Sequence, residues 1–180
     1  MQVIQLLKSY STGRRDFSGV DFREVWMPGV KLNQAVLRGA DLTRSNLSYS
    51  VLQETDFATA MLWRTNLSGA HLQRASFDKA TLIRCQLRKS FLAHCSFAEA
   101  DLRLADLRDA QLESANLRNA RLCYADLSGC SLRGSDLSGA DLTGAILSGA
   151  DLTDCRLTHA QLSRAEQSSV VAAPGTPMAV

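Results

Sequence analysis

Residues 135–154 read SDLSGADLTGAILSGADLTD, and in this stretch a leucine returns at every fifth position. The same period runs without insertion or deletion from Phe17 to Leu162, through 30 central positions of which 24 are Leu, five are Phe and one is Met27. The position two residues before the centre almost always carries a small side chain, most often Ala and elsewhere Ser, Thr, Cys or, near the start, Val. The chain is therefore one long array of pentapeptides.

A period of five suits neither regular element. Successive residues of an α-helix are rotated by about 100°, so leucines five residues apart would spread around the whole helix. In a straight strand, successive leucines would lie on opposite faces because five is odd. The chain must instead turn a corner once per repeat, which predicts a solenoid of stacked coils about 4.8 Å apart.

The phenylalanines indicate how many pentapeptides close one coil. Four of the five are separated by multiples of 20 residues: Phe17, Phe57, Phe77 and Phe97. Four pentapeptides per coil would stack these rings in one interior column. The pattern therefore favours a four-sided coil.

The repeat resembles the motif A-(D/N)-L-x-x of the pentapeptide-repeat family. Residues 40–44 (ADLTR) and 140–144 (ADLTG) match this motif as they stand, and the resemblance covers residues 17–164. It implies an all-β fold, a right-handed quadrilateral β-helix in which the central residue and the small residue before it point inward while the other three point outward. At four repeats per coil, the 30 repeats would form about 7.5 coils and a rod about 36 Å long.

The last position of the repeat is glycine in a run toward the C-terminal end, at Gly129, Gly134, Gly139, Gly144 and Gly149. Glycine adopts positive φ angles without steric cost, so this run predicts tight type II turns at the corners of the coil. In the middle of the chain the same position carries Arg, Lys, Glu or Tyr. We expect those corners to be less regular.

The two ends depart from the repeat. Residues 1–13 place four apolar side chains at helical spacing and Gly13 at a stopping position, which predicts a short N-terminal capping helix. Their motif LLxxYxxGxRDF resembles the opening of cyanobacterial members of the family. We expect the β-helix over residues 14–165 and a disordered tail over residues 166–180, which contain two prolines and no amphipathic period. Members that inhibit DNA gyrase often end in a dimerising helix; none is evident here, so we expect a monomer, with a weak dimer through the C-terminal coil as the alternative.

Charge and hydropathy exclude several classes of function. Lys and Arg number 20 and Asp and Glu number 18 in 180 residues, and the net charge of +2 argues against a strongly electrostatic binder of nucleic acid or of a membrane surface. No apolar run approaches the roughly 18 residues that a membrane span needs, and the first residues lack the pattern of a secretory signal. We expect a cytoplasmic protein with no membrane partner.

The residue types that most often carry chemistry are placed for structural roles. The five cysteines have no CxxC pairing, which argues against a zinc site and a disulfide framework. Four of them occupy the inward small position, where Cys acts as a slightly larger Ala: Cys85, Cys95, Cys130 and Cys155. The three histidines fall at outward positions, and a filled rod offers no pocket for acid–base catalysis. We expect no enzyme activity, no cofactor and no metal.

Asp or Asn often precedes the central residue, as at Asp41 and Asn116. A side chain of this kind can accept a hydrogen bond from nearby backbone at a corner. This structural role explains the preference without a catalytic carboxylate.

One outer wall of the predicted coil differs from the others. Its pentapeptides, centred on leucines 42 to 122, combine outward apolar side chains with arginines. The candidate partner-binding residues on it are Arg44, Met61, Trp63, Arg64, Ile83, Arg84, Arg103, Leu104 and Tyr124, and Arg121 is an outlying arginine of the same wall. Phe91, in a column of another wall, is also expected to be exposed. Aromatic and aliphatic groups beside arginines are typical of protein interfaces; the alternative is that scattered apolar residues have arisen by drift, with arginine stems lying over them.

Three functions remain after these exclusions. The first is a non-enzymatic scaffold that binds an unidentified protein through this wall. The second, implied by the quinolone-resistance members of the family, is a DNA mimic that binds a type II topoisomerase as a gyrase inhibitor or protector. That mechanism needs a continuous acidic stripe, but the column concerned is interrupted, since it reads Asp21, Asp41, Met61, Thr81, Asp101, Arg121 and Asp141. Direct nucleic-acid binding through the arginines ranks below both, because a net charge of +2 predicts weak contact.

Overall fold

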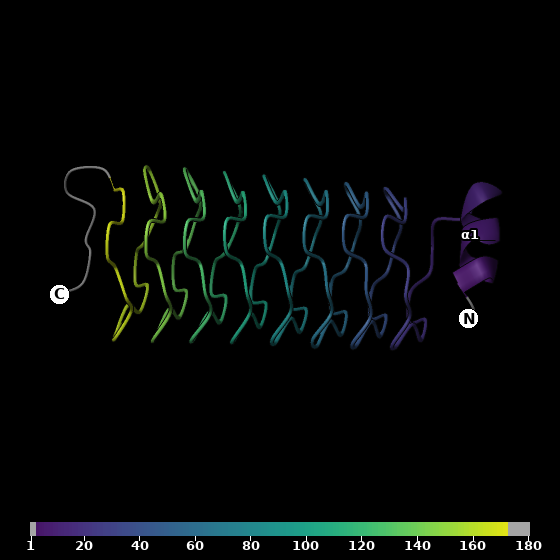
Figure 1. The fold of residues 1–180 in the computed structure, drawn as a ribbon, viewed down its shortest axis with the longest axis horizontal. Helices are drawn as coiled ribbons and strands as arrows, with labels where there is room; N and C mark the ends of the chain where they lie inside the picture. Colours follow the sequence, from purple (N-terminus) through teal and green to yellow (C-terminus); the bar gives the residue numbers. More distant parts are fainter. Residues whose placement is uncertain (1–2, 173–180) are drawn as a thin grey trace.

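The computed structural model describes residues 3–172 and shows a rod of stacked coils (Figure 1). Helix α1, Val3–Ser11, lies across one end of the rod, and the coils follow one another in sequence order toward the other end. Within the described residues α1 is the sole helix, and no helix there is long and apolar enough to cross a membrane. The β-structure of this part of the chain consists of isolated parallel bridges.

Each coil contains four pentapeptides. The parallel bridges join residues 20 positions apart, beginning with Asp16 and Val36. Backbone hydrogen bonds connect every coil to the next, as where the Leu42 N–H donates to the carbonyl oxygen of Met61 (2.8 Å). Successive coils therefore lie in register, with equivalent positions of the repeat directly above one another.

The phenylalanines confirm the four-sided coil from the inside. The rings of Phe57 and Phe77 stack with their centroids 4.9 Å apart, and those of Phe77 and Phe97 stack at 4.8 Å. Each pair is within 4° of parallel. Because these separations equal the spacing of hydrogen-bonded strands, the rings form the predicted interior column with one ring per coil.

The interior is filled by the two side chains that the repeat points inward. From Leu32 to Leu152 the central residues are at most 1% exposed, and the alanines two positions before the centres, from Ala35 to Ala150, are at most 2% exposed. Burying one leucine contributes roughly 1.5–3 kcal/mol before the loss of conformational entropy is subtracted. The stability of the rod therefore accumulates coil by coil.

Most polar residues at the inward small position are hydrogen-bonded, and the buried hydroxyl of Ser50 is an exception among the described residues. The hydroxyl of Thr65 donates to the carbonyl oxygen of Leu42 (2.7 Å), and the thiol of Cys95 donates to that of Leu72 (2.9 Å). In both cases the acceptor belongs to the central residue 23 positions earlier. Thr and Cys can therefore replace Ala at these sites without leaving a buried donor unpaired.

Every corner of the coil has the same backbone conformation. From Gly19 to Ser169, the last residue of each repeat has a φ angle between +54° and +71°, whether or not it is glycine. Across a typical corner the Ala35 N–H donates to the Leu32 carbonyl (3.1 Å), as in a type II turn. The prediction that corners without glycine are less regular is therefore wrong. From Gly19 to Gly149, inter-coil hydrogen bonds from the corner N–H hold these residues in the left-handed region, at a cost of roughly 1–2 kcal/mol per non-glycine residue.

At the N-terminal end, α1 packs onto the first coil. Leu6 is fully buried in the same apolar cluster as the central residues. The Tyr10 hydroxyl donates to the carbonyl oxygen of Asn33 (3.0 Å), and the guanidinium carbon of Arg15 lies 4.0 Å from the centre of the Tyr10 ring. These contacts bring the helix over an end of the coil that would otherwise present unpaired backbone groups.

At the C-terminal end, the β-helix continues past its predicted limit at residue 165. Glu166 and Val171 form parallel bridges with the preceding coil, so the tail predicted from residue 166 is wrong over residues 166–172. The leucine pattern stops before the hydrogen-bonded ladder does, because the last two central positions carry Gln167 and Ala172. The remainder of the predicted tail, residues 173–180, lies outside the described residues.

Candidate functional site

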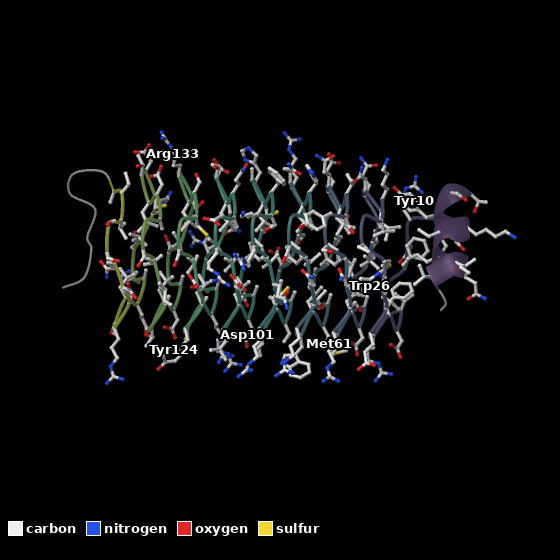
Figure 2. The ribbon with its side chains drawn as sticks, in the orientation of Figure 1. Tyr10, Trp26, Met61, Asp101, Tyr124 and Arg133 are labelled. Atoms are coloured by element: carbon white, nitrogen blue, oxygen red, sulfur yellow. The ribbon has the colours of Figure 1, made fainter. Side chains whose placement is uncertain are left out.

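The outward side chains of one face form a surface that we call the arginine wall. Its members are Arg44, Met61, Trp63, Arg64, Ile83, Arg84, Arg103, Leu104, Arg121 and Tyr124. Because residues 20 positions apart pair in neighbouring coils, these ten side chains lie in three adjoining columns. Figure 2 shows Met61, Asp101 and Tyr124 along the same edge of the rod.

Apolar groups of the arginine wall reach solvent. Met61 and Leu104 are each 46% exposed and Tyr124 is 58% exposed, while Trp63 and Ile83 are half-buried. All five lie at outward positions of the repeat, as predicted. Together they place apolar surface on four consecutive coils of one face.

Trp63 lies between two guanidinium groups. The Cζ atom of Arg64 is 4.6 Å from the centre of the indole ring, and the Cζ atom of Arg44, in the preceding coil, is 5.7 Å from it. Cation–π contacts of this kind contribute about 0.5–1 kcal/mol each at exposed sites. The two arginines therefore hold the indole in a defined position on the wall.

Two other arginines of the wall share the carboxylate of Asp101. Its carboxylate lies 2.7 Å from Arg103 and 3.2 Å from Arg121. Burial raises the pKa of Asp101, but the hydrogen bonds from Arg103 and the nearby positive charges outweigh burial and hold the pKa below its ordinary value. This part of the wall therefore carries less free charge than the number of its arginines indicates.

Arg64 and Arg84 differ from the remaining arginines of the wall. Arg44 has an acidic partner in Glu24, 3.1 Å away, whereas neither Arg64 nor Arg84 forms an ion pair with any described residue. Both are exposed, and they occupy successive coils of one column, about 4.8 Å apart along the rod. The wall thus contains two adjacent guanidinium groups that no carboxylate of the described chain balances.

Two shallow depressions of the wall meet at Leu104. The first depression, about 590 Å³ in volume, is lined by Arg64, Arg84, Gln86 and Leu104. The second depression, about 420 Å³, is lined by Ile83, Arg103, Leu104, Arg121, Cys123 and Tyr124. Two lining residues were not predicted from the sequence. Gln86 belongs to the adjacent face, whereas the outward position of Cys123 in the repeat could have identified it as a residue of the wall.

The structure does not bring Phe91 together with the other candidates. Phe91 lies on another face, is half-buried, and stacks on His71 with the ring centroids 4.5 Å apart, so it is less exposed than predicted. By contrast, Trp26 is 76% exposed and Tyr49 is 72% exposed. Both lie on the face next to the arginine wall, and their outward register was the signal that could have identified them.

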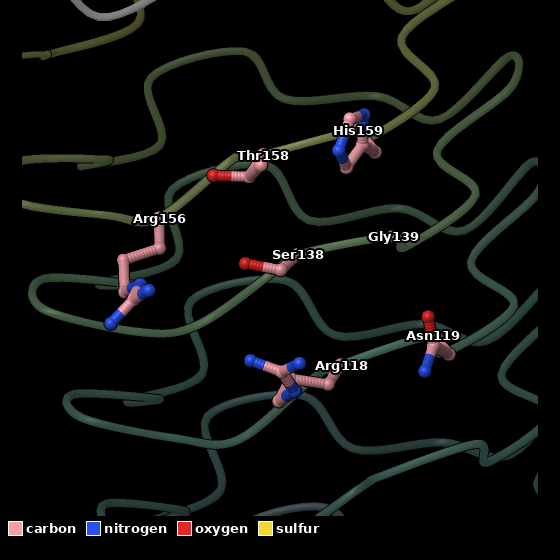
Figure 3. A pocket seen from close by; sticks show the side chains of 7 residues that line it. All are labelled: Arg118, Asn119, Ser138, Gly139, Arg156, Thr158 and His159. Carbon is pink, nitrogen blue, oxygen red and sulfur yellow. The ribbon is translucent and has the colours of Figure 1, made fainter.

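A third depression, about 300 Å³ in volume, lies on a different face toward the C-terminal end (Figure 3). Side chains from three successive coils line it, Arg118 and Arg156 among them. The Asp136 carboxylate lies 3.1 Å from Arg118 and 3.9 Å from Arg156. Because one carboxylate faces both arginines, this depression presents less free positive charge than the first depression of the wall.

The Asp and Asn residues before the central positions bond to backbone, as predicted. Oδ1 of Asp41 accepts a hydrogen bond from the Thr43 N–H (3.0 Å), and Oδ1 of Asn66 accepts one from the Ser68 N–H (3.0 Å). The same contact recurs at Asp151 and at other corners. These side chains therefore stabilise the turns that follow them.

The inward cysteines are packing residues. Burial raises the pKa of Cys95 and of Cys130 to about 12, and each thiol donates to a backbone carbonyl at 2.9 Å. A thiol that stays protonated is a poor nucleophile. Within residues 3–172, no group of three or more His, Cys, Asp or Glu side chains is arranged to hold a metal ion.

A comparison with protein-family models identifies the family of the chain. The model described as pentapeptide repeats matches segments that together cover most of it, namely residues 16–48, 56–92, 82–119, 100–139, 110–149 and 135–166. The chain is a pentapeptide-repeat protein. The right-handed quadrilateral β-helix of this family has the four-sided coils observed here.

Solved structures of other family members are similar to this pentapeptide-repeat protein. HetL, involved in heterocyst differentiation regulation in the cyanobacterium Nostoc sp., is 31% identical over 98% of this chain and 99% of HetL, with a TM-score of 0.36. A trypsin-treated form of QnrB1, a plasmid-mediated fluoroquinolone resistance protein, is 19% identical over 88% of this chain and 90% of its own, with a TM-score of 0.59. Rfr23 from the cyanobacterium Cyanothece is 20% identical over 96% of this chain and 100% of its own, with a TM-score of 0.29. Among curated proteins, none matches this chain.

Proposed function

We propose that this pentapeptide-repeat protein is a non-enzymatic binding module that captures a protein partner on its arginine wall. One observation carries the proposal: a single face combines apolar groups that reach solvent, such as Leu104 and Tyr124, with two arginines that lack an acidic partner among the described residues. Protein interfaces are enriched in aromatic side chains, Met and Arg. The wall has this composition.

The fold supports a role that depends on surface contact. The inward side chains fill the coil, and hydrogen bonds between coils hold the corners from Gly19 to Gly149 in one conformation. A surface that is already ordered loses little conformational entropy when a partner binds. A rigid wall of this kind suits the recognition of a partner by shape and charge.

The test is capture of a partner by the tagged protein from a lysate of the source organism. We expect Trp63→Ala combined with Ile83→Ser to abolish capture and to leave the urea unfolding curve close to that of the parent, because both side chains lie outside the core. The control variant, Trp26→Ala combined with Tyr49→Ser, removes two exposed aromatic groups from the neighbouring face and should capture normally. Undiminished capture by the first variant would rule out the wall as the interface.

A DNA mimic that binds a type II topoisomerase is the second candidate, favoured by the fold shared with QnrB1 at a TM-score of 0.59. A DNA mimic needs a row of free carboxylates, but here Asp101 is paired with two arginines and Asp21 lies 2.6 Å from Arg23. We therefore rank it second. Gyrase supercoiling measured with added protein separates the two candidates, since inhibition, or protection from a quinolone, would favour the DNA mimic.

A further inference from the structure

We infer that the first depression of the arginine wall binds an acidic side chain of the partner, and that the second depression receives an apolar side chain close to it in the partner's sequence. The ligand is then a short extended segment of a protein, acidic at one end and aromatic or aliphatic at the other. This inference rests on the proposed function and specifies the chemistry of the partner at the same wall.

Charge complementarity points to a carboxylate. The nearest arginines of the wall in the neighbouring coils already have carboxylate partners at 2.7–3.1 Å. Arg64 and Arg84 have none among the described residues, and their positive charges, one coil apart, repel each other. A carboxylate between them would relieve this repulsion and accept charge-assisted hydrogen bonds from both guanidinium groups.

The length of the unbalanced region favours a peptide segment over a nucleic acid. In the column beside the two arginines, Met61 and Thr81 separate Asp41 from Asp101. The two coils in which this column carries no carboxylate span about 10 Å along the rod. This length accommodates one or two acidic side chains. A phosphate backbone would extend beyond this region to arginines that already have carboxylate partners, and so would gain less from those further contacts.

Leu104 connects the charged and the apolar parts of the site. It is 46% exposed and lines both depressions, and Ile83 and Tyr124 add apolar surface to the second. The two depressions are centred one to two coils apart, roughly 5–10 Å along the rod, which two or three residues of extended chain cover. We therefore expect the apolar residue two or three positions from the acidic residue of the ligand.

Trp63 provides the signal for a binding experiment, because the guanidinium of Arg64 lies 4.6 Å from its ring. Trp26 is the other of the two tryptophans in the chain, so the Trp26→Phe protein isolates the emission of Trp63. The probes are the capped peptide GDEALFG, the same peptide with Lys in place of Asp and Glu, and a short single-stranded oligothymidylate.

We expect GDEALFG to change the Trp63 emission saturably at millimolar concentration, more weakly at high salt, and the Lys peptide to have no effect. Arg64→Gln combined with Arg84→Gln should weaken peptide binding, measured by calorimetry, at least about tenfold. The matched control is Arg74→Gln combined with Lys89→Gln. This control also removes two exposed corner cations that have no ion pair within residues 3–172, and both lie on faces other than the arginine wall. It should bind the peptide like the parent.

Three results would overturn the inference: no binding of GDEALFG, equal binding of the Lys peptide, or tighter binding of the oligothymidylate through the same two arginines. Such a failure is distinguishable from failure of the proposed function. If capture from lysate still depends on Trp63 and Ile83 while GDEALFG does not bind, the wall remains a protein-binding surface and the inferred acidic chemistry of the partner is wrong.

Discussion

Each corner of the coil places one residue in the left-handed region, and most of these residues are not glycine. On the arginine wall, Arg64, Arg84 and Leu104 have φ angles of 55°, 57° and 59°. An L-residue in this region is less stable than glycine by roughly 1–2 kcal/mol. Corners on all four faces carry such residues, so the side chains of the wall occupy positions where glycine would stabilise the fold, as many side chains of the other faces do.

Gly144→Ala tests the contact between Tyr124 and the next coil. A Cβ atom at Gly144 would lie 2.5 Å from Cε1 of Tyr124, so alanine must displace the ring in addition to adopting a φ of +66°. Gly149, with a φ of +68° and nothing within 4 Å of an added Cβ, is the matched control for backbone strain alone. We expect Gly149→Ala to lower the free energy of unfolding by roughly 1–2 kcal/mol and Gly144→Ala to lower it further.

Urea unfolding of both variants, repeated in a Tyr124→Ala background, measures this difference. The extra cost of Gly144→Ala should vanish once the ring is removed. An extra cost that persists without the ring would contradict the contact.

The register of individual side chains could be predicted from the sequence, whereas their pairing could not. Leu102 is buried and Leu104 is exposed, as their positions in the repeat require. A five-residue pattern does not reveal that Arg103 and Arg121 share Asp101. Nor does it reveal that the two arginines of the first depression have no such partner among the described residues. Ion pairing depends on residues two, 18 or 20 positions away and on the rotamers that long side chains adopt.

In each coil, every repeat points two side chains inward. The first must be small, and the central residue two positions later must be large. Ala100 and the central Leu102 are both fully buried. This alternation, and the 20-residue period shown by the phenylalanines, made the coil predictable. The final coil was not predictable from the leucines, because backbone hydrogen bonds continue there over Gln167 and Ala172.

Ala100→Trp tests the inward assignment of the small position. The added side chain has no room inside a filled coil, so we expect the free energy of unfolding to fall by at least about 3 kcal/mol, the upper end of typical over-packing costs. Ala98→Trp, two residues away at an outward position, should change stability by less than about 1 kcal/mol. Chemical unfolding of the two variants, compared with the parent, provides the measurement. Similar stabilities for both would be incompatible with the observed burial.

At the scale of the whole molecule, the rod presents four faces on the same backbone, and side chains alone distinguish them. A net charge of +2 conceals this difference, because Asp101 pairs with two arginines of the wall while Arg64 and Arg84 have no carboxylate partner within the described chain. The position of the wall could be predicted from the outward register. The two depressions could not, because they depend on side-chain conformations, and the first also involves Gln86 from the adjacent face.

We propose that a single face of the rod binds the partner. Cross-linking from the four corners of one coil tests this proposal. Leu104, Asp109, Ser114 and Asn119 occupy equivalent exposed corners with φ angles of 55° to 59°. A photo-reactive amino acid is placed at each in turn, and cross-links to the captured partner are quantified. We expect strong cross-linking from position 104 and little from position 114 on the opposite face. Equal cross-linking from all four corners, or more from 114 than from 104, would contradict this proposal.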